Sequence, residues 1–252
     1  MLRRALLFIA IGAVAGLIIW WPAAWVSRFL PPTLRCDAPQ GTIWSGECAS
    51  LLVKGAPVGR VAWRMQPRDL FVGRLSLSLD WRATANGHGH AKLAASLFDR
   101  RTLALRDVEL DTRIDALRAA MPSAPWPAGI DARVNAQWSR LELSEGLPTS
   151  LEGHMTIGDL RGASPQWQLP SELRLESSAT VVSADGLPMI RIVDRGDGGL
   201  RIRGSLTFVR PRGHQLELVL TPSDDPALRS AIAALGPRET DGSVRYSLAA
   251  TW

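Results

Sequence analysis

The chain has 252 residues and a mass of 27.4 kDa; 46% of its residues are apolar and 21% are charged. This composition is typical of one large globular domain or two small ones. It excludes a disordered chain, and two cysteines are too few for a disulfide-rich scaffold. The formal net charge of +5 comes almost entirely from arginines, which are interleaved with carboxylates. A nucleic-acid-binding face needs clustered basic residues, so this pattern argues against that class.

The N-terminal sequence predicts a membrane anchor. Arg3 and Arg4 precede residues 5–27, a run of 23 residues without a charged side chain. A helix needs about 20 apolar residues to cross the hydrocarbon layer. The positive-inside rule then places residues 1–4 in the cytoplasm and residues 28–252 outside it. We therefore expect a single-pass membrane protein with most of the chain outside the cytoplasm.

Three tryptophans, Trp20, Trp21 and Trp25, lie at the far end of this run. Amphipathic indole rings favour the headgroup level of a bilayer, which agrees with a membrane-spanning helix. A cleaved secretory signal is the alternative, although its apolar region typically has about 7–15 residues. We favour the uncleaved anchor, and in both cases the remainder of the chain is exported.

Cys36 and Cys48 are the only cysteines, with 11 residues between them. In an oxidising compartment, such a pair predicts one disulfide that closes a short loop. A metal site is disfavoured because the chain has no Cys-x-x-Cys motif and no histidine in this segment.

From Gly41 onward the dominant hydrophobic period is two. One face of residues 73–83 would carry Leu75, Leu77, Leu79 and Trp81, and one face of residues 130–143 would carry Ile130, Ala132, Val134, Ala136 and Trp138. Weaker alternation recurs at 58–65, 102–110, 172–182, 200–208, 214–220 and 243–251. Turns rich in Gly, Pro and Asp separate these segments, and the pattern predicts a mainly β, antiparallel meander of roughly a dozen strands.

Two short helices interrupt this pattern. Residues 112–121 have apolar side chains at helical spacing, and residues 225–235 have Pro226 in the first turn and a Gly-Pro stop. Both helices contain Ala-Leu-Arg and lead into a strand, so a weak duplication of residues 36–140 and 141–252 is one interpretation.

Two short helices cannot cover the apolar face of about a dozen strands. We therefore expect the sheet to curve over on itself as a taco-like sandwich. Its inner face would be filled by its own side chains or partly by another molecule.

Residues typical of catalysis or cofactor binding are scarce. His88 and His90 share one strand face, but no third ligand lies nearby in the sequence, and a polar strand face is the simpler interpretation. The chain has no nucleophile elbow, zinc-protease motif or phosphate-binding loop. We expect neither an enzyme nor a bound cofactor or metal.

Glycines, tryptophans and a proline follow a recognisable order in residues 40–82. A Gly-Thr-x-Trp-x-Gly motif comprises Gly41, Trp44 and Gly46. A longer motif comprises Trp63, Pro67, Leu70, Gly73 and Leu75, and Trp81 ends the next strand. Near the C-terminus, Leu235-Gly236 precedes an Asp241-Gly242 turn. In this order and spacing the chain resembles the type II secretion system protein N family of the Gram-negative general secretion pathway.

The resemblance implies a single-pass protein of the bacterial inner membrane whose β-domain lies in the periplasm. It would be an accessory subunit that contacts the inner-membrane platform proteins and the outer-membrane secretin, without catalytic residues. Trp44, Trp63 and Trp81 would then be either core side chains of the sheet, which we favour, or aromatic anchors for a partner. A second hypothesis is a periplasmic β-groove of the AsmA-like kind that binds or conducts lipid, because a curved sheet with an apolar inner face fits that class as well.

Overall fold

A computed structural model describes residues 16, 20–28, 30–84, 86–99, 101–120, 129–161, 169–178, 180, 182–183, 185–222 and 225–251. Arg3, Arg4 and most of the predicted membrane segment at 5–27 lie outside these residues. Within the described part, no helix is both long and apolar enough to cross a membrane.

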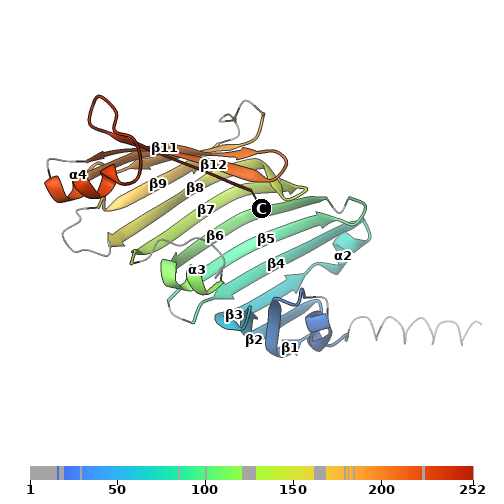
Figure 1. Cartoon of the computed structure of the whole chain (residues 1–252). Helices are drawn as coiled ribbons and strands as arrows, with labels where there is room; N and C mark the ends of the chain where they lie inside the picture. The colour runs from blue at the N-terminus through green and yellow to red at the C-terminus, as the bar shows by residue number, and fades with distance from the viewer. Residues whose placement is uncertain are drawn as a thin grey trace, which may run out of the picture.

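The described residues form one open sheet of thirteen strands, in which each strand pairs antiparallel with the next along the chain (Figure 1). The strands are β1 (Leu34–Gly41), β2 (Ser45–Val53), β3 (Ala56–Met65), β4 (Arg74–Arg82), β5 (His88–Ser96), β6 (Thr102–Arg113), β7 (Asp131–Ser144), β8 (Leu147–Arg161), β9 (Glu172–Ser177), β10 (Met189–Asp194), β11 (Leu200–Val209), β12 (Gly213–Pro222) and β13 (Val244–Thr251). The predicted antiparallel meander is confirmed. The predicted sandwich consists of one sheet that curves over on itself, and not of two separate sheets.

Some strands differ from their predicted extent. The segment expected at 172–182 ends as β9 at Ser177. The sequence pattern did not reveal β8, although it is the longest strand with 15 residues. The β7–β8 register shifts in three places, and Gly153 and Asp159 have positive φ. Each irregularity interrupts the alternation of side chains, so a search for apolar residues at every second position does not detect the strand.

In the described part of the chain, four short helices accompany the sheet: η1 (Ala23–Arg28), α2 (Pro67–Leu70), α3 (Ile114–Ala120) and α4 (Pro226–Ala233). The helices predicted at 112–121 and 225–235 correspond to α3 and α4, but both are shorter than expected. Residues 112–113 belong to β6, and the predicted Met121 lies outside the described residues. The sequence pattern did not predict η1 and α2, because each is too short to show a helical period.

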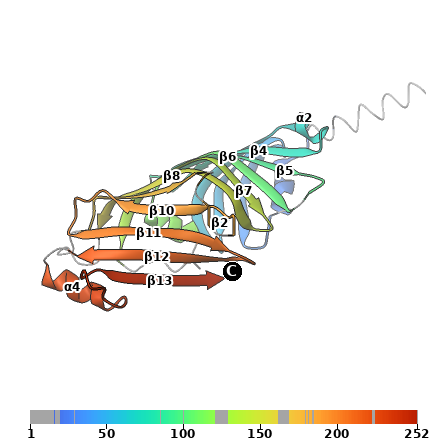
Figure 2. The same ribbon diagram turned by 90° about the horizontal axis from the view of Figure 1, so that it is seen from above.

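The two faces of the sheet differ in chemistry. Across five neighbouring strands, the pairing register aligns Leu77, Leu93, Leu105, Leu141 and Leu151 on one face. One residue further along β4, the register aligns Ser78, Lys92, Arg106, Arg140 and Glu152 on the opposite face. The sheet curls toward its apolar face, bringing β11–β13 over toward β1–β3 (Figures 1 and 2).

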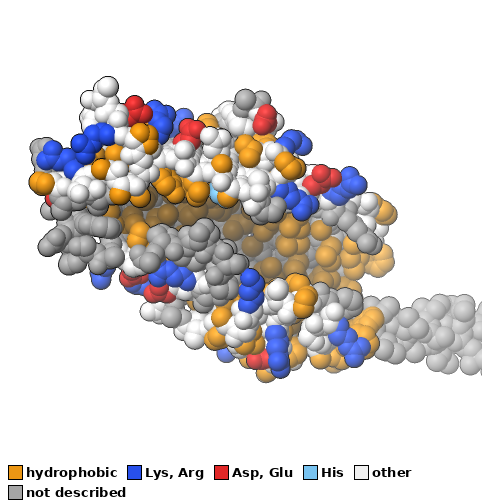
Figure 3. Space-filling model, in the orientation of Figure 1, with side chains coloured by type: hydrophobic (Ala, Val, Ile, Leu, Met, Phe, Trp, Pro, Cys, Tyr) orange, Lys and Arg blue, Asp and Glu red, His pale blue; other side chains and the backbone are white. Residues whose placement is uncertain are grey.

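Three buried clusters form where a helix covers the apolar face. Near η1 the cluster contains Ala23, Cys36, Cys48 and Trp63; near α3 it contains Ile114, Ala132 and Val134; near α4 it contains Leu200, Leu220, Leu228, Ile232 and Val244. Between these clusters, leucines such as Leu93, Leu105 and Leu141 are only half-buried. Among the described residues, the middle of the concave face is therefore an open apolar groove, which Figure 3 shows as a hollow lined by hydrophobic side chains.

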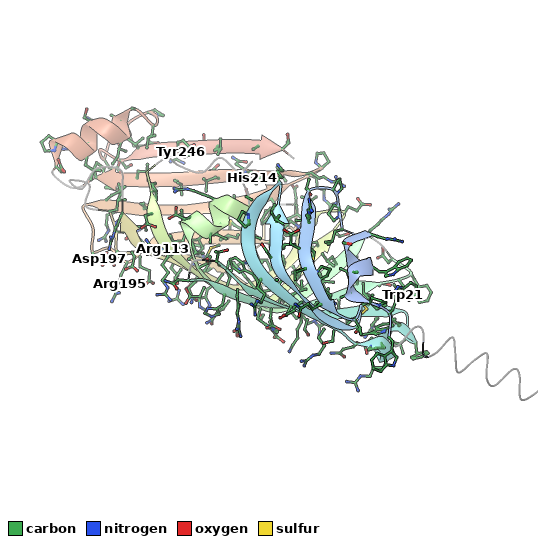
Figure 4. All side chains as sticks on the ribbon, turned by 90° about the horizontal axis from the view of Figure 1, so that it is seen from below. Trp21, Arg113, Arg195, Asp197, His214 and Tyr246 are labelled. Carbon is green, nitrogen blue, oxygen red and sulfur yellow. A yellow bond between two sulfur atoms is a disulfide. The ribbon has the colours of Figure 1, made fainter. Side chains whose placement is uncertain are left out.

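Because consecutive strands are antiparallel, the connections between them lie alternately at two opposite ends of the sheet. We call the end with the β1–β2, β3–β4, β5–β6, β7–β8, β9–β10 and β11–β12 connections the proximal end, and the opposite one the distal end. The N-terminal segment reaches the proximal end, where Pro22 forms a β-bridge with Thr42. Helices α3 and α4 lie in distal connections. Figure 4 shows Trp21 at the proximal end, with Arg195 and Asp197 at the distal end.

Candidate functional site

The first three strands contain the tryptophan–glycine motif, and Trp63 is its centre. Gly46 of β2 pairs with Trp63 of β3, and a Cβ atom added to Gly46 would lie 2.6 Å from ring atom Cζ2 of Trp63. The indole N–H of Trp63 donates a hydrogen bond to the carbonyl oxygen of Ile43 at 3.1 Å. Trp63 is 8% exposed. The ring therefore fills the space that a side chain at position 46 would occupy, and it fastens the β1–β2 turn to β3.

Gly41 and Trp44 shape the same turn. Gly41 has φ +89°, and a Cβ atom there would lie 2.5 Å from the carbonyl oxygen of Ser45. Only glycine adopts this conformation without strain. Trp44 is half-buried, and its carbonyl oxygen accepts a hydrogen bond of 2.6 Å from the N–H of Met65. Both residues thus hold the hairpin against β3.

The second half of the motif builds the β3–β4 connection. Pro67 occupies the first turn of α2, where its missing N–H costs no helical hydrogen bond. The N–H of Gly73 donates to the carbonyl oxygen of Leu70 at 3.0 Å, and Gly73 has φ +73°. The ring of Phe98 lies directly over Gly73. A glycine at this position therefore ends α2 and makes room for an aromatic ring from the next connection at the proximal end.

Trp81 belongs to the same apolar face. Its indole N–H donates to the carbonyl oxygen of Val58 at 3.0 Å, and its ring lies 3.3 Å from where a Cβ of Gly89 would be. Trp44 and Trp81 are half-buried, and Trp63 is buried. The two indole hydrogen bonds and the burial of Trp63 favour the structural interpretation of Trp63 and Trp81.

The predicted disulfide between Cys36 and Cys48 is confirmed. It joins β1 to β2 with a Cα–Cα distance of 5.5 Å. Both cysteines are buried in the cluster that contains Ala23 and Trp63. The bond therefore lies beneath the motif and links the two strands that carry it.

Residues 22–27, which the sequence analysis assigned to the end of the membrane segment, lie against the sheet. Ala23 of η1 is 1% exposed and packs on the disulfide cluster. The N–H of Ile43 donates to the carbonyl oxygen of Trp21 at 3.0 Å. An uncharged sequence cannot distinguish packing on a protein core from burial in lipid, because both environments are apolar.

The three N-terminal tryptophans have different surroundings. Trp21 and Trp25 meet edge to face with ring centroids 5.4 Å apart, and the Arg28 guanidinium lies 4.2 Å from the Trp25 ring centroid. Trp20 is 79% exposed at the proximal end. The cation–π contact and the ring pair stabilise the chain where it joins the sheet.

Ion pairs lie along the polar face. The Arg133 guanidinium donates hydrogen bonds of 2.9 and 2.7 Å to Asp111, which lowers the pKa of that carboxyl. A hydrogen bond of 2.8 Å from Lys92 likewise lowers the pKa of Asp107. These groups neutralise one another across neighbouring strands, as expected for a solvated sheet face.

The histidine pair lies on this polar face. His90 Nδ1 is 2.8 Å from Asp80 Oδ1, and His88 pairs with Asp111 in the β5–β6 register. In the described part of the chain, no three His, Cys, Asp or Glu side chains come together in a way that could hold a metal ion.

Sequence reasoning missed one buried carboxylate. The side chain of Asp194, at the end of β10, is 4% exposed. It accepts a hydrogen bond from the backbone N–H of Ile202, and Arg201 Nε lies 3.7 Å away. Because Asp194 ends its strand next to a glycine-rich turn, nothing in the alternation distinguishes it from an exposed turn aspartate.

The order and spacing of these residues match a known family. The family model for the type II secretion system (T2SS), protein N, matches residues 32–247. The chain belongs to the type II secretion system protein N family. No curated protein and no solved structure matches it.

The protein N match begins just before β1 and ends within β13, so it covers the disulfide and both motif halves. The resemblance based on Gly41, Trp44, Gly46, Trp63 and Gly73 is thereby confirmed. Membership supports an accessory role in type II secretion. In this protein N chain the motif residues belong to a curved sheet with two accessible features, the apolar groove and the proximal end.

Proposed function

We propose that the chain is an inner-membrane-anchored accessory subunit of the type II secretion system that links or stabilises the platform proteins and the outer-membrane secretin. The observation that carries this proposal is the protein N family match over residues 32–247. The predicted membrane segment at residues 5–27 would supply the anchor through the part that precedes η1, and the thirteen-stranded sheet would extend into the periplasm. It would contribute contacts and positioning, with no catalysis of its own.

The shape of the sheet supports a positioning role. It presents a proximal end beside the N-terminal segment and a distal end with α3 and α4 (Figure 1). The edge strands β1 and β13 each have one side without a strand neighbour in the described sheet. Exposed strand edges and rigid, ion-paired faces are surfaces that protein partners use.

A secretion assay tests the proposal. We expect deletion of the gene to lower secretion of folded periplasmic substrates across the outer membrane, while export across the inner membrane is unchanged. Removal of residues 5–19 should weaken the effect of the protein, because a tether raises the effective concentration of the domain near its partners. Platform proteins and the secretin should co-purify with the full chain. Normal secretion in the deletion strain would contradict the proposal.

The anchor has its own test. N-terminal sequencing of the mature protein should begin at the first residues of the chain, and a C-terminal reporter should be active only in the periplasm. A mature protein that begins after Ala24 would show a cleaved signal and would leave the domain without its tether.

A lipid-binding groove is a second candidate function, favoured by one observation. Leu77, Leu93, Leu105 and Leu141 form a half-buried row across the concave face, and no described helix covers the middle of that row. An open apolar hollow of this kind suits acyl chains.

Native mass spectrometry distinguishes the two functions. A lipid carrier should retain phospholipid masses that Leu141→Gln reduces, whereas Ser78→Gln on the polar face should leave them unchanged. A protein without bound lipid, together with a secretion defect, favours the linking role. Bound lipid and normal secretion favour the groove.

A further inference from the structure

Exposed large apolar side chains gather at the proximal end of the sheet. Phe71 is 92% exposed, Val72 68%, Leu97 47% and Phe98 89%. Phe71 and Val72 follow α2 in the β3–β4 connection, and Leu97 and Phe98 lie in the β5–β6 connection. We call these four residues the phenylalanine patch. A single exposed apolar side chain is ordinary, but four in adjacent connections mark a surface that something covers.

Hydrogen bonds hold the patch in this arrangement. The N–H of Leu97 donates to the carbonyl oxygen of Gly73 at 2.9 Å, which joins the two connections. The hydroxyl oxygen of Ser96 accepts hydrogen bonds of 3.2 Å from the N–H groups of Phe98 and Asp99. Phe98 thus lies over Gly73 in a turn that is held by the Ser96 side chain, and its ring is exposed.

The N-terminal segment reaches the sheet at the same end. Trp21 and Thr42 connect that segment to the β1–β2 turn, and Trp20 is 79% exposed there. Val182, in the β9–β10 connection, is a further exposed apolar residue of this end, at 49%.

We propose that the phenylalanine patch inserts into the interfacial layer of the lipid bilayer that the proposed membrane anchor crosses. This inference rests on the proposed membrane anchor. Rings at turn tips suit a bilayer interface, where aromatic side chains are favoured. Arg68 and Arg74 flank Phe71 and Val72, and their charge complements anionic headgroups. The strands then point away from the membrane, and α3 and α4 extend toward the distal, periplasmic side.

Spin labels in the full chain test this contact. The native cysteines form a disulfide, so Phe71→Cys and Phe98→Cys each provide one thiol for labelling. Leu235→Cys is the matched control, because Leu235 is also exposed, at 51%, but lies after α4 at the distal end. The labelled proteins are reconstituted in nanodiscs of phosphatidylethanolamine and phosphatidylglycerol. Collision rates with oxygen, which concentrates in lipid, and with a water-soluble nickel chelate are then measured.

We expect labels at positions 71 and 98 to collide several-fold more with oxygen, relative to nickel, than the label at position 235. Equal ratios at all three positions would overturn the proposal. Shielding from both reagents at 71 and 98 would also overturn it, because another protein surface would then cover the patch. Failure of the chain to co-elute with the nanodiscs would refute the anchor itself, whereas co-elution with water-exposed labels would refute only the patch contact.

Discussion

The indole ring of Trp63 lies against the backbone of Gly46 on the neighbouring strand, so that a Cβ atom at position 46 would be 2.6 Å from the ring. The Trp63 ring therefore occupies the space that a side chain would need at position 46, which lies 17 positions earlier in the sequence. This relationship explains why a glycine in β2 faces a tryptophan in β3 in this chain.

Substitution of Gly46 should destabilise the fold by overpacking. We expect Gly46→Ala to lower the free energy of unfolding by about 1–3 kcal/mol, because the new Cβ would lie 2.5 Å from the carbonyl oxygen of Gln40 and 2.6 Å from the Trp63 ring, and both have to shift. Gly158→Ala is the control: its nearest contact would be 3.9 Å from the new Cβ, an ordinary distance. Urea denaturation of both variants measures the difference. Equal stability of Gly46→Ala and the wild type would contradict this close packing around Gly46.

Removal of the Trp63 side chain should have a larger effect. Trp63 is 8% exposed and loses a hydrogen bond to Ile43 when it is truncated. We expect Trp63→Ala to cost about 3–5 kcal/mol, because it leaves a large cavity beside the disulfide. The neighbouring Arg64 is exposed, so Arg64→Ala should change stability by less than about 0.5 kcal/mol. A loss of secretion without a loss of stability in Trp63→Ala would support the partner-anchor interpretation instead.

The disulfide should contribute measurably to stability. Reduction, or the Cys48→Ser variant, should lower the free energy of unfolding by about 3 kcal/mol, because the bond limits the conformations of the unfolded chain. Quantitative labelling of Cys36 and Cys48 without prior reduction would contradict a disulfide in the isolated protein. The circular dichroism signal of the sheet should be retained, because β4–β13 do not depend on this bond.

The Asp111–Arg133 pair predicts a pH dependence. Arg133 lowers the pKa of Asp111 in the folded state. The ion pair therefore contributes its full stabilisation at a pH above the pKa of Asp111 in the unfolded chain, about 3.9. This contribution disappears as the pH falls through the lower pKa of the folded state. Asp111→Asn should be less stable than the wild type at pH 7, and this difference should shrink below about pH 4.

The double variant Asp111→Asn/Arg133→Gln identifies the cause. At pH 7 it should be no less stable than Asp111→Asn alone, because the ion pair is already absent in the single variant. A difference between wild type and Asp111→Asn that is constant from pH 7 to pH 3 would exclude the ion pair as the source of the effect.

Several features of the fold follow from the sequence because they are local. The alternation in residues 73–83 predicts β4 and its apolar face, since successive side chains of a strand point to opposite sides. Pro226 and the Gly-Pro stop identify α4 within a few residues. The spacing of Cys36 and Cys48 predicts the disulfide, and the order of Gly41, Trp44 and Gly46 indicates the family.

Other local predictions failed where the backbone is irregular. The bulges of β7 and β8 interrupt the alternation of apolar and polar side chains, so a search for a period of two does not detect β8. Residues 22–27 carry no charge. This is expected of a membrane segment, and it is equally expected of a segment that packs on a protein core, as η1 does. Composition alone does not separate these two environments. The proposed duplication of residues 36–140 and 141–252 stays a prediction.

Only the tertiary structure decides what the apolar face does. Alternation places Leu93, Leu105 and Leu141 on one face, but the curl of the sheet leaves them half-buried in an open groove. Likewise, Phe71 and Phe98 are 27 residues apart and become neighbours only because the β3–β4 and β5–β6 connections lie at the same end. The pleat of one strand sets the period of its side chains, whereas curvature and the meeting of connections depend on contacts between strands that are distant in the sequence.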